Sequence, residues 1–182
     1  MSVVVYDSRR QIMAADTRAY SGSSHPIGNK MKIHRIERGK FVGSLVGVTT
    51  AVPGQAEEFI HWLNESARRE AAWVPANPDF EAILVEPNGA VHLYYDAYYS
   101  SGPLVGEVFT IGSGKKYALG AWHALQDAVK AVEVAIACDT MCGGPVAALP
   151  LHEPRTSDQP QEQLPLDLSG FSTGTTLSSP VA

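Results

Sequence analysis

Residues 2–20 read SVVVYDSRRQIMAADTRAY, and this stretch decides the fold. Ser2 leads directly into the good strand formers of residues 3–6, and a second β-like run covers residues 11–15. The polar DSRR between the two runs is typical of a hairpin loop. Most domains leave their first few residues loose. A strand that starts at the second residue therefore predicts that the N-terminus itself is used.

Other strands and turns follow from alternation and turn residues. Asn88-Gly89 is a preferred two-residue turn and predicts a hairpin over residues 80–95. The Gly-, Ser- and Pro-rich residues 21–29 indicate a loop. The remaining strands are predicted over residues 30–36, 40–47, 107–111 and 145–151, with a turn at 37–39 and a glycine turn at 112–114.

Three segments are expected to be helical. The first runs from Pro53, a residue suited to a first helical turn, to about Trp73. The second covers about residues 115–129. The third covers about residues 131–139 and ends near CGG, where Gly143 is able to cap it. The order strands, helix, strands, two helices, strand predicts one α+β domain over residues 1–152, with helices outside a sandwich of sheets.

Composition sets limits on the function. The 182 residues are 45% hydrophobic, which suffices for one sizeable core. A net charge of −5 argues against a nucleic-acid partner, which needs a basic face. No apolar run is long enough to span a membrane. Cys138 and Cys142 do not make a disulfide framework, so we expect a cytoplasmic protein with reduced thiols. Residues 153–182 are rich in Pro, Ser, Thr and Gln, and we expect a disordered tail.

Ser2 carries the first chemical hypothesis. Methionine aminopeptidase removes Met1 when a small residue follows it, and the product would carry a hydroxyl and an α-amine on one residue. The amine has a reference pKa of about 7.7–8.0, so it is a usable general base beside the nucleophile that it would activate. Alternatively, Ser2 is simply the residue that follows the initiator.

Five motifs in one order bear on that choice: IMAADTRAYSG, KMKIHRI, VGSLVG, FTIGSGKKYALGA and ACDTMCGG. With these motifs, residues 2–150 resemble the proteasome β-subunit and bacterial HslV family of N-terminal nucleophile hydrolases. The resemblance implies a four-layer αββα sandwich and peptide-bond hydrolysis inside stacked rings. The family nucleophile is an N-terminal Thr, and Ser2 stands in its place.

The resemblance also implies roles for further residues. Asp16 matches the family acid and Lys32 the family lysine, whose ammonium lowers the pKa of the nucleophile. Ser113 and Asp139 match the residues that support the N-terminal amine. Cys142 replaces a family Ser, and a thiol is the weaker hydrogen-bond donor.

The resemblance places the oxyanion donor at Ser44, where the family usually has Gly, beside Gly43. A backbone N–H survives this change of side chain, although the pocket becomes more crowded. The substrate pocket is expected at Val42, with Ala19, Lys30, His34 and Val46 as further candidates.

Alternatives remain open. The chain is either an active peptidase, a ring or scaffold protein that has lost activity, or a hydrolase of small amides. The partners expected are other copies of the chain, unfolded protein or peptide substrates and, in the family manner, an ATPase unfoldase. No cofactor and no metal are expected, because the two cysteines lack partners spaced for zinc. The GSG of residues 112–114 lacks the rest of a phosphate-binding motif.

Overall fold

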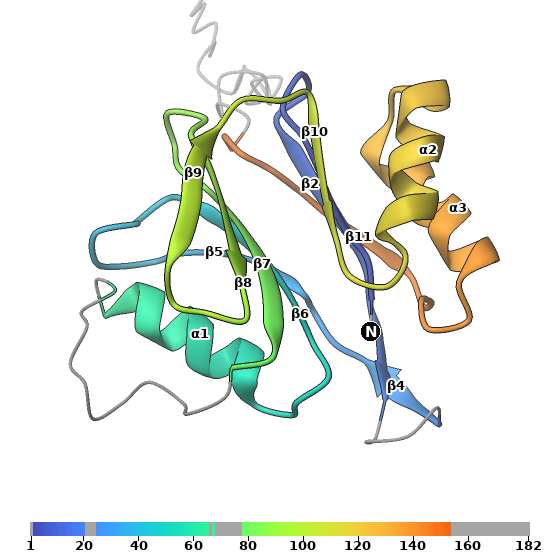
Figure 1. The fold of residues 1–182 in the computed structure, drawn as a ribbon, viewed down its shortest axis with the longest axis horizontal. Coiled ribbons are helices and arrows are strands. Elements are labelled where there is room, and N and C mark those ends of the chain that lie inside the picture. The colour runs from blue at the N-terminus through green and yellow to red at the C-terminus, as the bar shows by residue number, and fades with distance from the viewer. Residues whose placement is uncertain (1, 21–24, 66, 68–77, 154–182) are drawn as a thin grey trace, which may run out of the picture.

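The computed structural model describes residues 2–20, 25–65, 67 and 78–153 (Figure 1). No helix in these ranges is long and apolar enough to cross a membrane. The elements in chain order are β1 (Val4–Asp7), β2 (Ile12–Asp16), β3 (Arg18–Tyr20), β4 (Pro26–Asn29), β5 (Ile33–Arg35), β6 (Leu45–Thr50), α1 (Gln55–Asn64), β7 (Phe80–Val85), β8 (Val91–Tyr95), β9 (Ser100–Leu104), β10 (Val108–Ile111), α2 (Lys115–Leu125), α3 (Ala128–Cys138) and β11 (Val146–Pro150).

Two antiparallel sheets stack face to face between helices. One has the strand order β10-β1-β2-β11 and the other β5-β6-β7-β8-β9, while β3 and β4 form a separate pair. Helix α1 covers the outer face of the five-stranded sheet, and α2 and α3 cover the outer face of the four-stranded sheet (Figure 1). The result is the four-layer αββα sandwich that the sequence motifs predict.

The N-terminal strand is buried on both faces, which explains its unbroken apolar run. Val4 and Tyr6 point between the sheets, whereas Val3 and Val5 point outward and pack beneath α2 and α3. The hairpin to β2 turns at Asp7, whose Oδ1 accepts the N–H groups of Arg9 and Arg10 at 2.9 and 3.1 Å. Because β1 is central, Ser2 is held at the edge of the core instead of fraying into solvent.

The five-stranded sheet contains the predicted hairpin. The Gly89 N–H donates to the Glu86 carbonyl at 2.8 Å and the Glu86 N–H to the Ala90 carbonyl at 2.9 Å. On the outer face of this sheet, Phe59 of α1 stacks among aromatic rings, with ring centroids 4.6 Å from Phe80 and 5.0 Å from Tyr94. This contact fixes α1 over β6 and β7.

Several predicted boundaries were wrong. Helix α1 ends at Asn64 instead of Trp73, because Glu65 leaves the helical conformation at φ −86° and ψ 25°, and Ala67, at φ 53°, turns its N–H back to the Trp62 carbonyl at 3.0 Å. Residues 66 and 68–77 lie outside the described part of the chain. The expected loop over residues 21–29 contains strand β4, and β9 had no predicted counterpart. The predicted tail also lies outside the described residues from 154 onward.

Two more element boundaries differ from the prediction, and the second of them bears on the site. The break between the last two helices lies at residues 126–127, because Gln126 has φ 54° and the Asp127 side chain caps α3 by accepting the Lys130 N–H. The strand predicted over residues 40–47 is β6, and it runs to Thr50. The loop that follows β6 is therefore displaced along the chain from where the motif comparison put it.

Candidate active site

A buried ion pair lies beside Ser2. Lys32, just before β5, places its Nζ 2.8 Å from Oδ1 of Asp16 at the end of β2. The same oxygen accepts the Val3 N–H at 2.9 Å, and Oδ2 accepts the Gly143 N–H at 3.0 Å. Asp16 is fully buried and Lys32 is 8% exposed. Burial lowers the pKa of Lys32 from its ordinary value, and the Asp16 carboxylate opposes that shift.

The glycine turn between β10 and α2 holds the backbone of Ser2. The Ser2 N–H donates to Ser113 Oγ at 3.2 Å, and the Gly114 N–H donates to the Ser2 carbonyl, also at 3.2 Å. Gly112 has φ +91°, and a Cβ there would lie 2.2 Å from the Ser2 carbonyl oxygen. The turn therefore requires glycine, both for its backbone conformation and for its close approach to Ser2.

Cys142 and Asp139 lie on the far side of Ser113 from Ser2 and continue the chain of polar contacts that begins at the Ser2 N–H. Cys142 Sγ lies 4.0 Å from Ser113 Oγ and donates to Asp139 Oδ2 at 3.6 Å. Partial burial raises the pKa of Asp139, but hydrogen bonds from the Met141 N–H and from Ser113 and Cys142 outweigh it, so the pKa lies below its ordinary value. Burial raises the pKa of the Cys142 thiol to about 12, with the carboxylates of Asp16 and Asp139 adding to the shift. Cys142 is therefore a neutral thiol at physiological pH.

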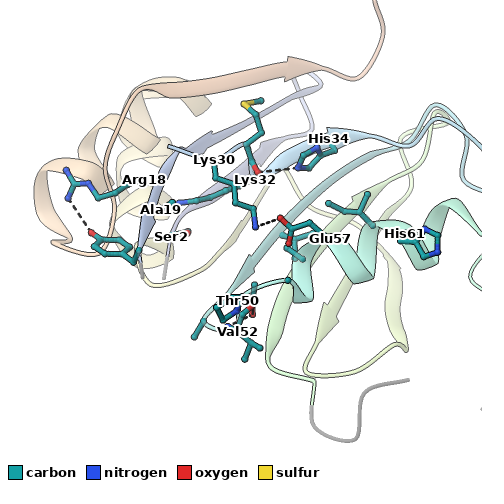
Figure 2. A pocket seen from close by; sticks show the side chains of 18 of the residues that line it. Ser2, Arg18, Ala19, Lys30, Lys32, His34, Thr50, Val52, Glu57 and His61 are labelled. Atoms are coloured by element: carbon teal, nitrogen blue, oxygen red, sulfur yellow. Dashed lines mark hydrogen bonds and ion pairs between the residues drawn. The ribbon is translucent and has the colours of Figure 1, made fainter. Parts of the chain in front are cut away.

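A cavity of about 580 Å³ opens beside Ser2 (Figure 2). Strands β3 and β6, the segment leading into β5, and α1 contribute its lining. Lys30 and Glu57 reach toward each other across it, with Nζ 2.5 Å from Oε1 (Figure 2). The hydrogen bond from Lys30 lowers the pKa of Glu57, so this carboxylate is ionised at neutral pH. Burial lowers the pKa of His34, which also lines the cavity.

The structure brings most of the predicted site residues together. Ser2, Lys32, Ala19, Lys30 and His34 all line the cavity. Asp16 contacts Lys32, and Ser113 contacts Ser2. Asp139 and Cys142 join the site through Ser113.

Ser44 and Gly43 do not lie in this site, contrary to the sequence expectation. The Ser44 N–H donates to the Phe41 carbonyl at 3.0 Å, and the Gly43 N–H donates to the Ile36 carbonyl at 2.8 Å. Ser44 also lies four residues before Val48, the residue of β6 beside Lys32, which is about 14 Å along a strand at ~3.4 Å per residue. An N–H that is already bonded and remote from Ser2 does not serve as an oxyanion donor there.

Two of the predicted pocket residues are also corrected. Val46 is fully buried in the core beneath α1, and Val42 is 55% exposed in the turn before β6. Neither lines the cavity, whereas Val48 and Val52 do. The error has the same cause as that at Ser44, because the end of β6 was placed several residues too early.

Thr50 is a functional candidate that the sequence motifs did not indicate. The Val48 N–H donates to the Lys32 carbonyl at 2.9 Å. Backbone N–H groups alternate in direction along an antiparallel strand, so the Thr50 N–H points to the same side as that of Val48. Thr50 and Ser2 both line the cavity. Among the residues described, no cluster of three or more His, Cys, Asp or Glu side chains is placed to hold a metal ion.

No protein-family model and no curated protein matches the sequence. Solved structures do match. The HslV of Trypanosoma brucei has 15% identity and a TM-score of 0.60, over 81% of this chain and 97% of that one.

Two other solved structures give similar values. The BPH protein of Thiobacillus denitrificans in complex with epoxomicin has 18% identity and a TM-score of 0.56, over 81% of this chain and 96% of that one. A Gly-1 mutant of Anbu from Hyphomicrobium has 12% identity and a TM-score of 0.60, over 81% of this chain and 80% of that one. Together with the stacked sheets and flanking helices, these likenesses show that the chain has the N-terminal nucleophile hydrolase fold of HslV and BPH.

Proposed function

We propose that this chain is a peptidase whose nucleophile is Ser2 Oγ, freed for catalysis by removal of Met1. One observation carries the proposal: Ser2 lies between the turn that bonds its backbone and the buried Lys32–Asp16 pair, at the edge of a cavity large enough for a side chain. This arrangement brings a nucleophile, a cation and a binding cavity together, and removal of Met1 would add the α-amine of Ser2 as the general base that acyl transfer also needs.

The reaction would proceed through an acyl-enzyme. The Ser2 hydroxyl attacks the scissile carbonyl carbon while the α-amine of the same residue takes the hydroxyl proton. The C–N bond then breaks, the proton passes from the amine to the leaving nitrogen, and an ester on Ser2 Oγ remains. Water attacks this ester and gives its proton to the same amine. A carboxylic acid leaves, and the Ser2 hydroxyl is restored.

Lys32 and Thr50 would stabilise the charges of this path. The Lys32 ammonium, fixed by Asp16, favours the developing alkoxide of Ser2. The Thr50 N–H, directed to the cavity side of β6, is our candidate donor to the oxyanion of the tetrahedral intermediate, in place of Ser44. Ser113, Asp139 and Cys142 would orient the α-amine.

We further propose that copies of the chain assemble into closed, stacked rings that admit unfolded or peptide substrates, with an ATPase unfoldase as partner. Closed rings are a usual form of homo-oligomer. Light scattering coupled to size exclusion tests the assembly. A monomer at micromolar concentration would contradict it without touching the proposal for Ser2.

The decisive test is the intact mass of the purified chain before and after an electrophilic peptide. Epoxomicin, the ligand of the BPH structure, is the first choice. We expect a chain without Met1 that gains one adduct, and no adduct in Ser2→Ala. A chain that retains Met1 has no free amine on Ser2, and that result would overturn the peptidase in favour of a catalytically inactive ring or scaffold protein.

The substrate class needs a second assay. Hydrolysis of casein by the wild-type chain, absent in Ser2→Ala, is the expected result for a peptidase. Turnover of small amides alone, with casein intact, would replace the proposal by an amide hydrolase on the same fold.

A further inference from the structure

Glu81 connects the five-stranded sheet to the turn that holds Ser2. It lies on β7, paired with Thr49 of β6, and its side chain is about one quarter exposed. Its Oε2 accepts the Gly112 N–H at 2.8 Å, and its Oε1 accepts from Lys115 Nζ at 2.6 Å. Both carboxylate oxygens are thus used at one end of the sandwich, on the opposite sheet from Ser2.

Glu81 bonds the glycine turn of residues 112–114, and the same turn forms hydrogen bonds with the backbone of Ser2. Gly112 packs its backbone against the Ser2 carbonyl, with no room for a Cβ. The next two residues, Ser113 and Gly114, make the hydrogen bonds to the Ser2 N–H and carbonyl. Movement of the turn would therefore move the nucleophile and the amine together.

We propose that Glu81 is a positioning residue for the peptidase reaction, acting through the Gly112 N–H to set the place of Ser2. The inference rests on the proposed function of Ser2. A misplacement of about 1 Å costs about 10²-fold in rate when a reaction depends on orientation. The Gly112 N–H and the Lys115 ammonium use different oxygens of the Glu81 carboxylate, so the bond to Gly112 does not depend on Lys115.

Variants of Glu81 separate the length of its side chain from its charge. Glu81→Gln removes the charge but keeps an oxygen at the right distance for the Gly112 N–H, and the Lys115 side chain, 36% exposed, turns its ammonium to solvent away from the amide NH2. Glu81→Asp keeps the charge but is one methylene shorter, so its carboxylate falls short of Gly112. Glu81→Leu removes both the charge and the acceptor oxygen for the Gly112 N–H. Lys115→Met leaves the bond between Glu81 and Gly112 available and serves as the matched control.

The experiment measures kcat and KM on a peptide substrate, together with the rate of adduct formation at Ser2, in the full chain. We expect Glu81→Asp to lower kcat and the adduct rate about 10²-fold, with KM within about threefold of wild type. For Glu81→Gln and Lys115→Met, kcat, KM and the rate of adduct formation should each stay within about threefold of wild type. Wild-type kcat in Glu81→Asp, or a Glu81→Gln as slow as Glu81→Asp, would overturn the positioning role.

Hydrogen exchange at the backbone of residues 112–114 gives a readout that needs no activity and guards against a Glu81→Leu that fails to fold. Exchange should be faster in Glu81→Asp than in Glu81→Gln. If wild type forms no adduct while this exchange pattern holds, the peptidase proposal fails and Glu81 keeps only a structural contact. If wild type forms the adduct and exchange is equal in the two variants, the inference about Glu81 fails alone.

Discussion

Lys32 Nζ lies 2.8 Å from Asp16 Oδ1, and both side chains are withdrawn from solvent. The same carboxylate accepts backbone N–H groups from Val3 and from Gly143, which come from the two ends of the domain. One buried anion thus orients the lysine beside Ser2 and also joins the N-terminal strand to the segment after α3. A carboxylate with these partners has a structural role as well as a chemical one.

Removing the Asp16 carboxylate should destabilise the fold strongly. In Asp16→Ala the Lys32 ammonium loses its partner and two buried N–H groups lose their acceptor. Breaking a buried pair in this way costs about 3–5 kcal/mol of unfolding free energy. Urea denaturation measures it. Lys32→Met is the control, since Asp16 keeps both N–H donors, and it should cost less stability while reducing turnover. An Asp16→Ala variant within about 1 kcal/mol of wild type would contradict this reading of the site.

Cys142 should be unreactive in the folded protein. It is 1% exposed, and burial raises the pKa of its thiol to about 12, so almost no thiolate forms at pH 8. Cys138 is exposed. Iodoacetamide at pH 8 should label one cysteine in the native chain and two in urea. Cys138→Ser should abolish the native labelling. Native labelling of Cys142 at a rate similar to that of Cys138 would refute the buried, neutral thiol.

Ser44→Ala should stabilise the protein and leave hydrolysis unchanged. The Ser44 hydroxyl is fully buried, and its Oγ has no hydrogen-bond partner within the part of the chain that the structure describes. An unsatisfied buried polar group costs about 1–3 kcal/mol, and alanine removes it without adding volume. Thermal and urea unfolding measure the gain. A Ser44→Ala variant no more stable than wild type would contradict the unsatisfied hydroxyl, and because alanine keeps the backbone N–H, the variant tests the side chain alone.

The ion pair between Lys30 and Glu57 should set the charge preference of the cavity. In wild type the two charges satisfy each other, so we expect uncharged residues before the scissile bond to be preferred. Lys30→Ala leaves Glu57 unpaired and should shift kcat/KM toward Lys and Arg. Glu57→Gln leaves Lys30 unpaired and should shift it toward Asp and Glu. We expect a change of about tenfold in the ratio of the two substrate classes.

Salt provides the control for that prediction. Both side chains of the pair are partly exposed, so 0.5 M NaCl should reduce the shift by screening. A salt-independent change, or a change in the same direction for both variants, would show that shape and not charge decides the preference.

Local patterns in the sequence predicted an α+β domain with helices outside a sandwich of sheets, whereas the four layers and the site residues were expected from the family resemblance of the motifs. The apolar run of residues 3–6 predicted a strand, which the structure buries on both faces, and Asn88-Gly89 predicted the hairpin of β7 and β8. Ser2, Asp16 and Lys32 lie close to the ends of elements that short-range patterns identify. Their approach to one another was expected from the family resemblance of the motifs.

The tertiary structure alone decided which residues of β6 face the site and what holds the Ser2 turn. Side chains and N–H groups alternate along a strand, so a strand end misplaced by a few residues exchanges Ser44 and Val46 for Val48 and Thr50. The contacts of Glu57 with Lys30 and of Glu81 with Gly112 join elements far apart in the chain. Local propensity carries no information about such pairs, because they form only when the two sheets and α1 have packed.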